Sequence, residues 1–196
     1  MQANLRKDRS RMRELGLFAR NFVKHPRMLG SVIPSSRFLI ERVLHRVEWD
    51  RARTIVEYGP GVGTFTREIL KRLHPEGTLL VLETNPDFVR FLRESVDDPR
   101  LHVVHASAAT IGDALHERGL ASADYVISGI PFSTLPAEVR RAVLDATRTS
   151  LDPRGAFLVY QFSARVLPDL KRIFSGVRRA YEPRNVLPAH LFFCAP

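Results

Sequence analysis

The sequence is poor in several features that define common protein classes. Cys194 is the single cysteine in 196 residues, so neither a disulfide framework nor a cysteine-based zinc site is expected. No apolar run approaches the roughly 20 residues that a transmembrane helix needs, and the N-terminus lacks the uncharged apolar segment of a signal peptide. We therefore expect a cytoplasmic protein in a reducing compartment.

What the chain has in excess is positive charge. It contains 30 Lys and Arg residues against 21 Asp and Glu residues, a formal charge of +9. Such a surplus favours polyanionic partners, either nucleic acid or an anionic membrane surface. At 44% hydrophobic residues the chain can still bury a core, and its length predicts one domain with at most a short appendage.

Most of this charge lies at the N-terminus. Residues 1–27 contain eight basic and two acidic side chains, a charge of +6. Apolar residues recur every three or four positions from Met12 to Phe22, which predicts a helix with one apolar face. Such a basic helix either docks on a membrane or a partner, or packs its apolar face on its own domain. Its expected membrane contacts are Arg6, Lys7, Arg9, Arg11, Arg13, Phe18 and Phe22.

Beyond this segment, apolar strands alternate with helices. We expect strands at 53–58, 78–83, 101–106, 124–128, 155–162, 177–181 and 189–193, and helices at 36–47, 64–73, 86–95, 111–118, 136–149 and 168–174. The alternation predicts an α/β fold with a doubly wound, Rossmann-like, seven-stranded and mostly parallel sheet that has helices on both faces. We place this domain at 37–196, and a basic helix with a lid-like loop at 1–36. Ligands of such sheets bind beyond the carboxyl ends of the strands.

The first strand ends in a glycine-rich turn that follows an acid, with the sequence Glu57-Tyr58-Gly59-Pro60-Gly61-Val62-Gly63. Glycines allow a ligand to approach the backbone closely, and the next helix presents its N-terminus there. The spacing is not the dinucleotide pattern G-x-G-x-x-G, and no Gly-Lys-Ser/Thr follows for phosphate. Glu83 ends the second strand, where an acid is placed to accept hydrogen bonds from two ribose hydroxyls.

E-x-G-x-G-x-G followed by a strand-ending acid resembles the class I S-adenosylmethionine (SAM) methyltransferases. The resemblance implies that SAM is the cofactor; the alternative is a glycine turn that only serves strand–helix packing. Where this family often has an acid near the adenine amino group, the chain has a serine at 107, which we expect to accept the same hydrogen bond. The expected cofactor contacts in this domain are Glu57, Gly59, Gly61, Gly63, Glu83, Ser107 and Ser128.

The stretch S-G-I-P-F-S at 128–133 resembles the N-[IL]-P-[YF] motif of rRNA adenine dimethyltransferases. In that family the Asn side chain and a backbone carbonyl grip the target amine. Here Gly129 occupies the Asn position, which would cost a base-reading enzyme a hydrogen bond. Those enzymes also carry a C-terminal helical RNA domain, which we do not expect here, so nucleic acid is not the partner that we expect.

A resemblance over nearly the whole chain is to the soluble bacterial phospholipid N-methyltransferases. It rests on P-R-M-L-G-S-V-I-P-S-S at 26–36, V-E-Y-G-P-G-V-G-T-F-T at 56–66, S-G-I-P-F-S at 128–133 and Y-Q-F-S at 160–163. It implies conversion of phosphatidylethanolamine to its mono-, di- and trimethyl forms, the last being phosphatidylcholine. It also implies a lid over the methyl donor, in which we expect Ser31 and Ser35 to contact the cofactor.

The acceptor in such a reaction is a neutral, oriented amine shielded from water. Our candidates for orienting its lone pair are the carbonyl oxygens of Gly129 or Ile130, with no dedicated base. Tyr160, at the end of the fifth strand, is the candidate for a polar contact to the amine; the alternative is a core tyrosine.

Further residues are expected to bind the lipid head group. Aromatic faces stabilise quaternary ammonium ions. The candidate rings are Phe132, Tyr160 and either Tyr181 or Phe22, with core packing as the alternative for each ring. Candidates for the phosphate are Arg178, Arg179, Arg184, Lys171 and Arg172, and the sequence does not choose among them. The seven histidines show no paired zinc spacing, so no metal is expected.

The sequence thus predicts a phospholipid N-methyltransferase that binds peripherally to the inner face of the cell membrane. Three alternatives stay open. They are an RNA adenine N-methyltransferase, a non-catalytic protein of the same fold that binds nucleic acid or membrane, and a methyltransferase for a small-molecule amine.

Overall fold

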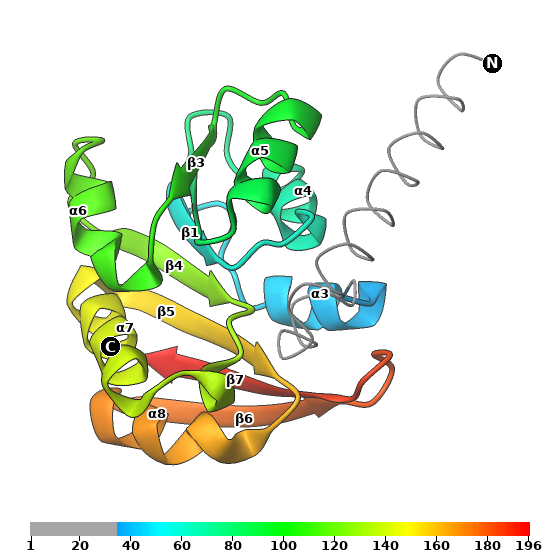
Figure 1. Ribbon diagram of the computed structural model, residues 1–196, viewed down its shortest axis with the longest axis vertical. Helices are drawn as coiled ribbons and strands as arrows, with labels where there is room; N and C mark the ends of the chain where they lie inside the picture. Colours follow the sequence, from blue (N-terminus) through cyan, green and yellow to red (C-terminus); the bar gives the residue numbers. More distant parts are fainter. Residues whose placement is uncertain (1–34) are drawn as a thin grey trace.

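The computed structural model describes residues 35–196, which fold around one mixed sheet (Figure 1). The strands are β1 (Thr54–Tyr58), β2 (Thr78–Glu83), β3 (Leu101–His105), β4 (Ala123–Ser128), β5 (Leu151–Gln161), β6 (Gly176–Glu182) and β7 (Ala189–Ala195). Their order across the sheet is β3-β2-β1-β4-β5-β7-β6. The first five strands pair in parallel, and β7 is antiparallel to both of its neighbours. The predicted mostly parallel, seven-stranded sheet is confirmed.

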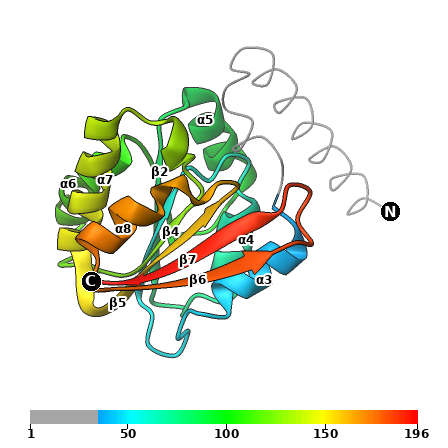
Figure 2. The same ribbon diagram turned by 90° about the horizontal axis from the view of Figure 1, so that it is seen from below.

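Helices cover both faces of the sheet (Figures 1 and 2). Helices α3 (Arg37–Leu44), α4 (Thr64–Leu70) and α5 (Pro86–Ser95) pack on one face, and α6 (Ile111–His116), α7 (Ala137–Ser150) and α8 (Leu167–Ile173) on the other. Short 3-10 turns are η2 (Ala108–Thr110), η3 (Phe132–Thr134) and η4 (Ala164–Val166). In residues 35–196 no helix combines the length and apolar character needed to cross a membrane.

Local sequence signals explain where these helices begin. Ser36 precedes α3, and its Oγ accepts a hydrogen bond from Leu39 N at 3.2 Å. Asn85 does the same for α5 by accepting from Asp87 N at 2.9 Å, and Pro86 takes the first helical position, where no N–H is needed. Each cap satisfies a backbone donor that the helix itself leaves without a partner.

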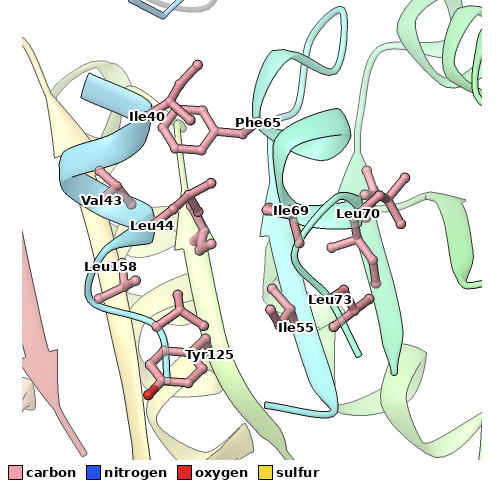
Figure 3. Close-up of a cluster of buried hydrophobic side chains, with 14 of the residues drawn as sticks. Ile40, Val43, Leu44, Ile55, Phe65, Ile69, Leu70, Leu73, Tyr125 and Leu158 are labelled. Carbon is pink, nitrogen blue, oxygen red and sulfur yellow. The ribbon is translucent and has the colours of Figure 1, made fainter. Parts of the chain in front are cut away.

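The core on the α3 side of the sheet joins that helix to α4 (Figure 3). Ile40, Val43 and Leu44 of α3 lie toward Phe65 and Ile69 of α4 above the central strands. All five side chains are buried, and each contributes roughly 1.5–3 kcal/mol of hydrophobic stabilisation. This packing fixes the start of α3, and with it Ser35 and Ser36, against the sheet.

One strand is longer than the sequence predicts. β5 begins at Leu151 rather than at 155, because the chain pairs with β4 on both sides of an irregularity. The register shifts between the Ala123–Leu151 and Tyr125–Ala156 pairs. Pro153 and Gly155 lie inside this bulge, so a stretch that looks like a turn in the sequence belongs to a strand.

The carboxyl ends of the parallel strands meet at one edge of the sheet, where a ligand is expected. Because β7 is antiparallel to both neighbours, β6 runs in the same direction as β5. The loop 183–188 between β6 and β7 therefore reaches the same edge, beside the start of α3 (Figures 1 and 2). A hydrogen bond of 2.8 Å from Ser36 N to Asn185 Oδ1 ties the two together.

Candidate active site

The glycine turn after β1 has the left-handed backbone that glycine permits. Gly59, Gly61 and Gly63 have φ angles of 62°, 56° and 79°, a region that favours glycine. At Gly63 a side chain is also excluded by space, because a Cβ would lie 2.5 Å from Leu92 Cδ2. Gly61 and Gly63 are buried in the chain. Other residues would therefore strain the turn and, at Gly63, crowd it against α5.

Glu83 is held at the end of β2 beside this turn. Its carboxylate accepts hydrogen bonds from Asn85 N at 2.8 Å and from Gly61 N at 3.4 Å. The side chain is buried, and burial raises the pKa of Glu83 despite these backbone donors. Each carboxylate oxygen keeps a further lone pair. The geometry therefore fits the predicted grip on two ribose hydroxyls of SAM.

Glu57 lies beneath the turn, inside the core. Its Oε2 accepts a hydrogen bond of 2.7 Å from Thr66 Oγ1 of α4, and burial raises its pKa to about 8, against the opposing effect of that hydrogen bond. From α4, Arg67 Nη1 donates to Val62 O at 2.6 Å and to Gly63 O at 3.2 Å. Glu57 and Arg67 together fasten the turn to β1 and α4.

Two predicted serine contacts have different surroundings. Ser107 is exposed after β3, where its Oγ accepts from Ala109 N at 3.2 Å and caps the η2 turn. A second lone pair on that oxygen leaves the expected adenine contact open as a proposal. Ser128 is completely buried, and its Oγ accepts from Ile130 N at 3.3 Å. The structure thus gives Ser128 a role in holding the 128–132 turn, and its expected cofactor contact stays a prediction.

The turn after β4 is braced by a residue that the sequence analysis did not single out. Gln161, at the end of β5, donates from Nε2 to Ile130 O and accepts from Phe132 N at 3.1 Å. The Ile130 carbonyl also accepts from Phe132 N at 2.9 Å. A carbonyl oxygen has two lone pairs, so both lone pairs of the Ile130 carbonyl have partners within the protein. We therefore keep Gly129 as the candidate that orients the amine.

Tyr160 lies against Gly129 across the β4–β5 pair. A Cβ at Gly129 would lie 2.7 Å from Tyr160 Cζ and still closer to its hydroxyl oxygen. The Tyr160 ring stacks on Phe65, with centroids 4.7 Å apart and planes at 13°. Its hydroxyl shares a hydrogen bond with Ser35, and burial, together with the nearby Glu57, raises its pKa. The structure therefore brings Gly129, Tyr160 and Ser35 together.

The two expected aromatic partners of Tyr160 lie elsewhere. Phe132 is completely buried and packs edge-on against Phe157, with ring centroids 6.2 Å apart. Tyr181 is 47% exposed and packs on His190. In the register β5–β7–β6, Tyr160 is level with Ala180 and not with Tyr181, so the two tyrosines point to opposite faces. An aromatic cage built from Phe132, Tyr160 and Tyr181 is therefore wrong.

Other expected contacts lie on β6 or outside the described residues. Arg178 and Arg179 are exposed on β6, and Arg179 Nη2 lies 3.0 Å from His190 Nδ1. Within residues 35–196, no group of His, Cys, Asp and Glu side chains is arranged to hold a metal ion. The predicted cofactor contact Ser31 lies outside the described residues, and so do the membrane contacts Arg6, Lys7, Arg9, Arg11, Arg13, Phe18 and Phe22.

The chain is similar in sequence to known methyltransferases. A sequence model of the family described as ribosomal RNA adenine dimethylase matches residues 23–112. The ornithine lipid N-methyltransferase of Singulisphaera acidiphila is 35% identical over 191 residues, which cover 93% of this chain and 96% of that protein. A probable ribosomal RNA small subunit methyltransferase A of Thermococcus kodakarensis is 29% identical over 107 residues, which cover 54% of this chain and 37% of that protein.

Solved structures share the fold at low sequence identity. Precorrin-6y C5,15-methyltransferase from Geobacter metallireducens has a TM-score of 0.62 and 16% identity, covering 79% of this chain and 85% of its own. Human methyltransferase-like protein 13, in complex with S-adenosylhomocysteine, has a TM-score of 0.60 and 18% identity, covering 81% and 79%. The near full-length relative, the shared fold and the glycine turn with Glu83 agree. The chain is a class I SAM-dependent methyltransferase and belongs to the family of the ornithine lipid N-methyltransferase of S. acidiphila.

Proposed function

We propose that this enzyme methylates the primary amine of a membrane aminolipid, with phosphatidylethanolamine as the first candidate. Successive transfers would lead to phosphatidylcholine. The named activity of the S. acidiphila relative makes an ornithine lipid the second candidate. Both head groups present a primary amine close to an anionic group, so the same site chemistry would serve either lipid.

The cofactor side of the proposal rests on the glycine turn. When bound, SAM supplies an electrophilic methyl group carried on a sulfonium. Gly59, Gly61 and Gly63 would lie against it, because glycines without side chains let a ligand approach the backbone closely. Glu83 would hold the ribose hydroxyls, since two backbone N–H groups fix its carboxylate in place.

On the acceptor side, we assign two groups to the amine. The hydroxyl oxygen of Tyr160 accepts a hydrogen bond from the amine, and the Gly129 carbonyl accepts a second, which together fix the direction of the nitrogen lone pair. A primary ammonium has a pKa near 10 in water, and the buried surroundings of Tyr160 favour its neutral form. This chain's own residues therefore bind, orient and desolvate the nucleophile.

The observation that carries the proposal is the fit of Tyr160 against Gly129. In the rRNA adenine dimethyltransferase motif an Asn stands at this position, and here the Tyr160 ring fills the space that any side chain at 129 would occupy. A tyrosine hydroxyl accepts a hydrogen bond from an alkyl amine, but it does not reproduce the amide that grips an adenine edge. The pair therefore favours a small aliphatic amine over a nucleobase.

An RNA adenine N-methyltransferase is the second candidate, because a family model for rRNA adenine dimethylases matches residues 23–112. That match ends before the 128–133 turn, so it covers the cofactor half of the site and not the acceptor half. The charge of +9 suits either polyanion. We propose that it serves an anionic membrane, with residues 1–24 as a basic interfacial anchor on the inner face of the cell membrane.

The proposal is tested by offering acceptors in parallel. Purified full-length enzyme and methyl-labelled SAM are mixed with vesicles of phosphatidylethanolamine or ornithine lipid, each containing an anionic lipid, and separately with total RNA. We expect label in the lipid phase, falling as salt rises, and chromatography then counts the methyl groups. Label in RNA alone would overturn the proposal in favour of the second candidate.

A further inference from the structure

Exposed apolar side chains concentrate at the hairpin between β6 and β7. Val186 and Leu187 in its loop are 72% and 40% exposed, and Tyr181 on β6 is 47% exposed. Among residues 35–196, Val139 on α7 is the one other exposed side chain of this large apolar kind. A clustered set of exposed apolar groups marks an interaction surface more often than single ones do. We call residues 181–188 the apolar hairpin.

The apolar hairpin is held in one shape by its own hydrogen bonds and by α3. Asn185 accepts from Ser36 N at 2.8 Å and donates from Nδ2 to Leu187 O at 2.9 Å. Arg184 N donates to Glu182 Oε1 at 3.0 Å. Because these bonds fix the loop backbone, Val186 and Leu187 face outward as part of a built surface.

Positive charge surrounds this apolar tip. Residues 175–188 contain three arginines and one glutamate. That glutamate, Glu182, is completely buried and paired with Arg42 at 3.3 Å and Arg184 at 3.0 Å. Glu182 offsets only one of these two arginines. The exposed Arg179, which lies on the same face of β6 as Tyr181, adds further positive charge.

The apolar hairpin stands at the same edge of the sheet as the acceptor site (Figures 1 and 2). Gln161, which braces the acceptor turn, is level with His190 of β7, and His190 is level with Tyr181 of β6. Two strand spacings separate Gln161 from Tyr181, about 10 Å. The base of the apolar hairpin at Tyr181 is thus close to the strand that braces the acceptor turn.

We infer that the apolar hairpin inserts Val186 and Leu187 into the interface of an anionic lipid bilayer, with Arg179 facing the lipid phosphates. The inference rests on the proposed lipid substrate and adds a second contact to the N-terminal anchor. Charge complementarity selects the bilayer as the occupant, because arginines around a small apolar tip match anionic head groups above acyl chains. Bound in this way, the enzyme would present its acceptor site to the lipid layer.

Vesicle sedimentation of full-length enzyme tests this contact directly. The double variant Val186→Asp with Leu187→Asp should partition at least about tenfold more weakly onto vesicles of phosphatidylethanolamine and an anionic lipid. Arg179→Ser should weaken partitioning about fivefold at low salt, and more than Arg178→Ser, whose side chain projects from the opposite face of β6. The matched controls, Val139→Asp on α7 and Arg154→Ser at the opposite edge of the sheet, should leave it unchanged.

A second readout separates this inference from the proposed function. With a short-chain phosphatidylethanolamine below its micelle concentration, the double aspartate variant should methylate as fast as the wild type, while losing activity on vesicles. Unchanged vesicle binding by the double aspartate variant overturns the inference. If protease cleavage within residues 1–34 also increases in that variant, the hairpin binds this segment and not the bilayer. Wild-type enzyme that methylates neither lipid form overturns the proposed function instead.

Discussion

Replacing Gly129 by alanine probes the contact on which the acceptor site depends. The φ angle of Gly129 is not positive, so an alanine backbone is allowed there and the added Cβ acts through space alone. That Cβ would lie 2.7 Å from Tyr160 Cζ, about 1 Å inside normal contact. The tyrosine ring must therefore move, and its stacking on Phe65 at 4.7 Å moves with it.

The expected cost is that of an overpacked site, about 1–3 kcal/mol in the free energy of unfolding. For a domain of this size each kcal/mol lowers Tm by about 2–4 °C. A displacement of this size in the acceptor site lowers methyl transfer by up to about 100-fold, while SAM affinity stays constant because Glu83 and the glycine turn are untouched.

A double-mutant cycle isolates this contact from other effects. Tyr160→Leu removes the hydroxyl and the distal ring, so Gly129→Ala should cost almost nothing in that background. The coupling free energy between the two positions should then be about 1–3 kcal/mol, measured by urea unfolding of all four proteins. An equal cost of Gly129→Ala in both backgrounds would refute the contact, and wild-type activity of the single variant would refute its role in catalysis.

Three further predictions address the rest of the site. Glu83→Gln should weaken SAM binding about ten- to hundredfold by calorimetry, because a neutral amide replaces a fixed charged acceptor; the exposed Glu117→Gln serves as its control. The folded-state pKa of Glu57 is about 8, above its ordinary 4.5, so stability should fall between pH 4.5 and 8 by at most about 5 kcal/mol. Urea unfolding across this pH range should show a smaller fall in the free energy of unfolding for Glu57→Gln than for the wild type. An equal fall in both proteins would contradict the raised pKa of Glu57. Gln161→Leu should reduce methyl transfer and cost about 1–3 kcal/mol of stability without changing SAM affinity, and a change in that affinity would count against its bracing role.

The cofactor half of the site could be predicted from the sequence because its determinants are local. A strand, three glycines at fixed spacing and a strand-ending acid place Glu57, Gly61 and Glu83 together in any parallel sheet with this order. The structure adds what spacing cannot give. It shows Glu57 turned inward to Thr66, with a raised pKa, while Glu83 accepts from the turn itself.

The acceptor half depends on contacts between strands, and there the prediction succeeded only in part. The sequence points to Tyr160 and Gly129 separately, but their steric fit follows from the β4–β5 register. The sequence also does not show that Gln161, the neighbour of Tyr160, bonds to the Ile130 carbonyl, or that Phe132 enters the core. Only the glutamine of Y-Q-F-S at 160–163 hinted at this brace, since a polar side chain ending a buried strand needs partners.

The most direct test of the central claim is a lipid analysis of cells that make no N-methylated lipids of their own. Such cells, expressing the full-length chain or its Glu83→Gln variant at equal levels, are extracted and their lipids analysed by mass spectrometry. The account predicts N-methylated aminolipids with the wild-type chain and a strong reduction with the variant. If these cells contained no N-methylated aminolipids although their expressed wild-type protein binds SAM, the account would be contradicted.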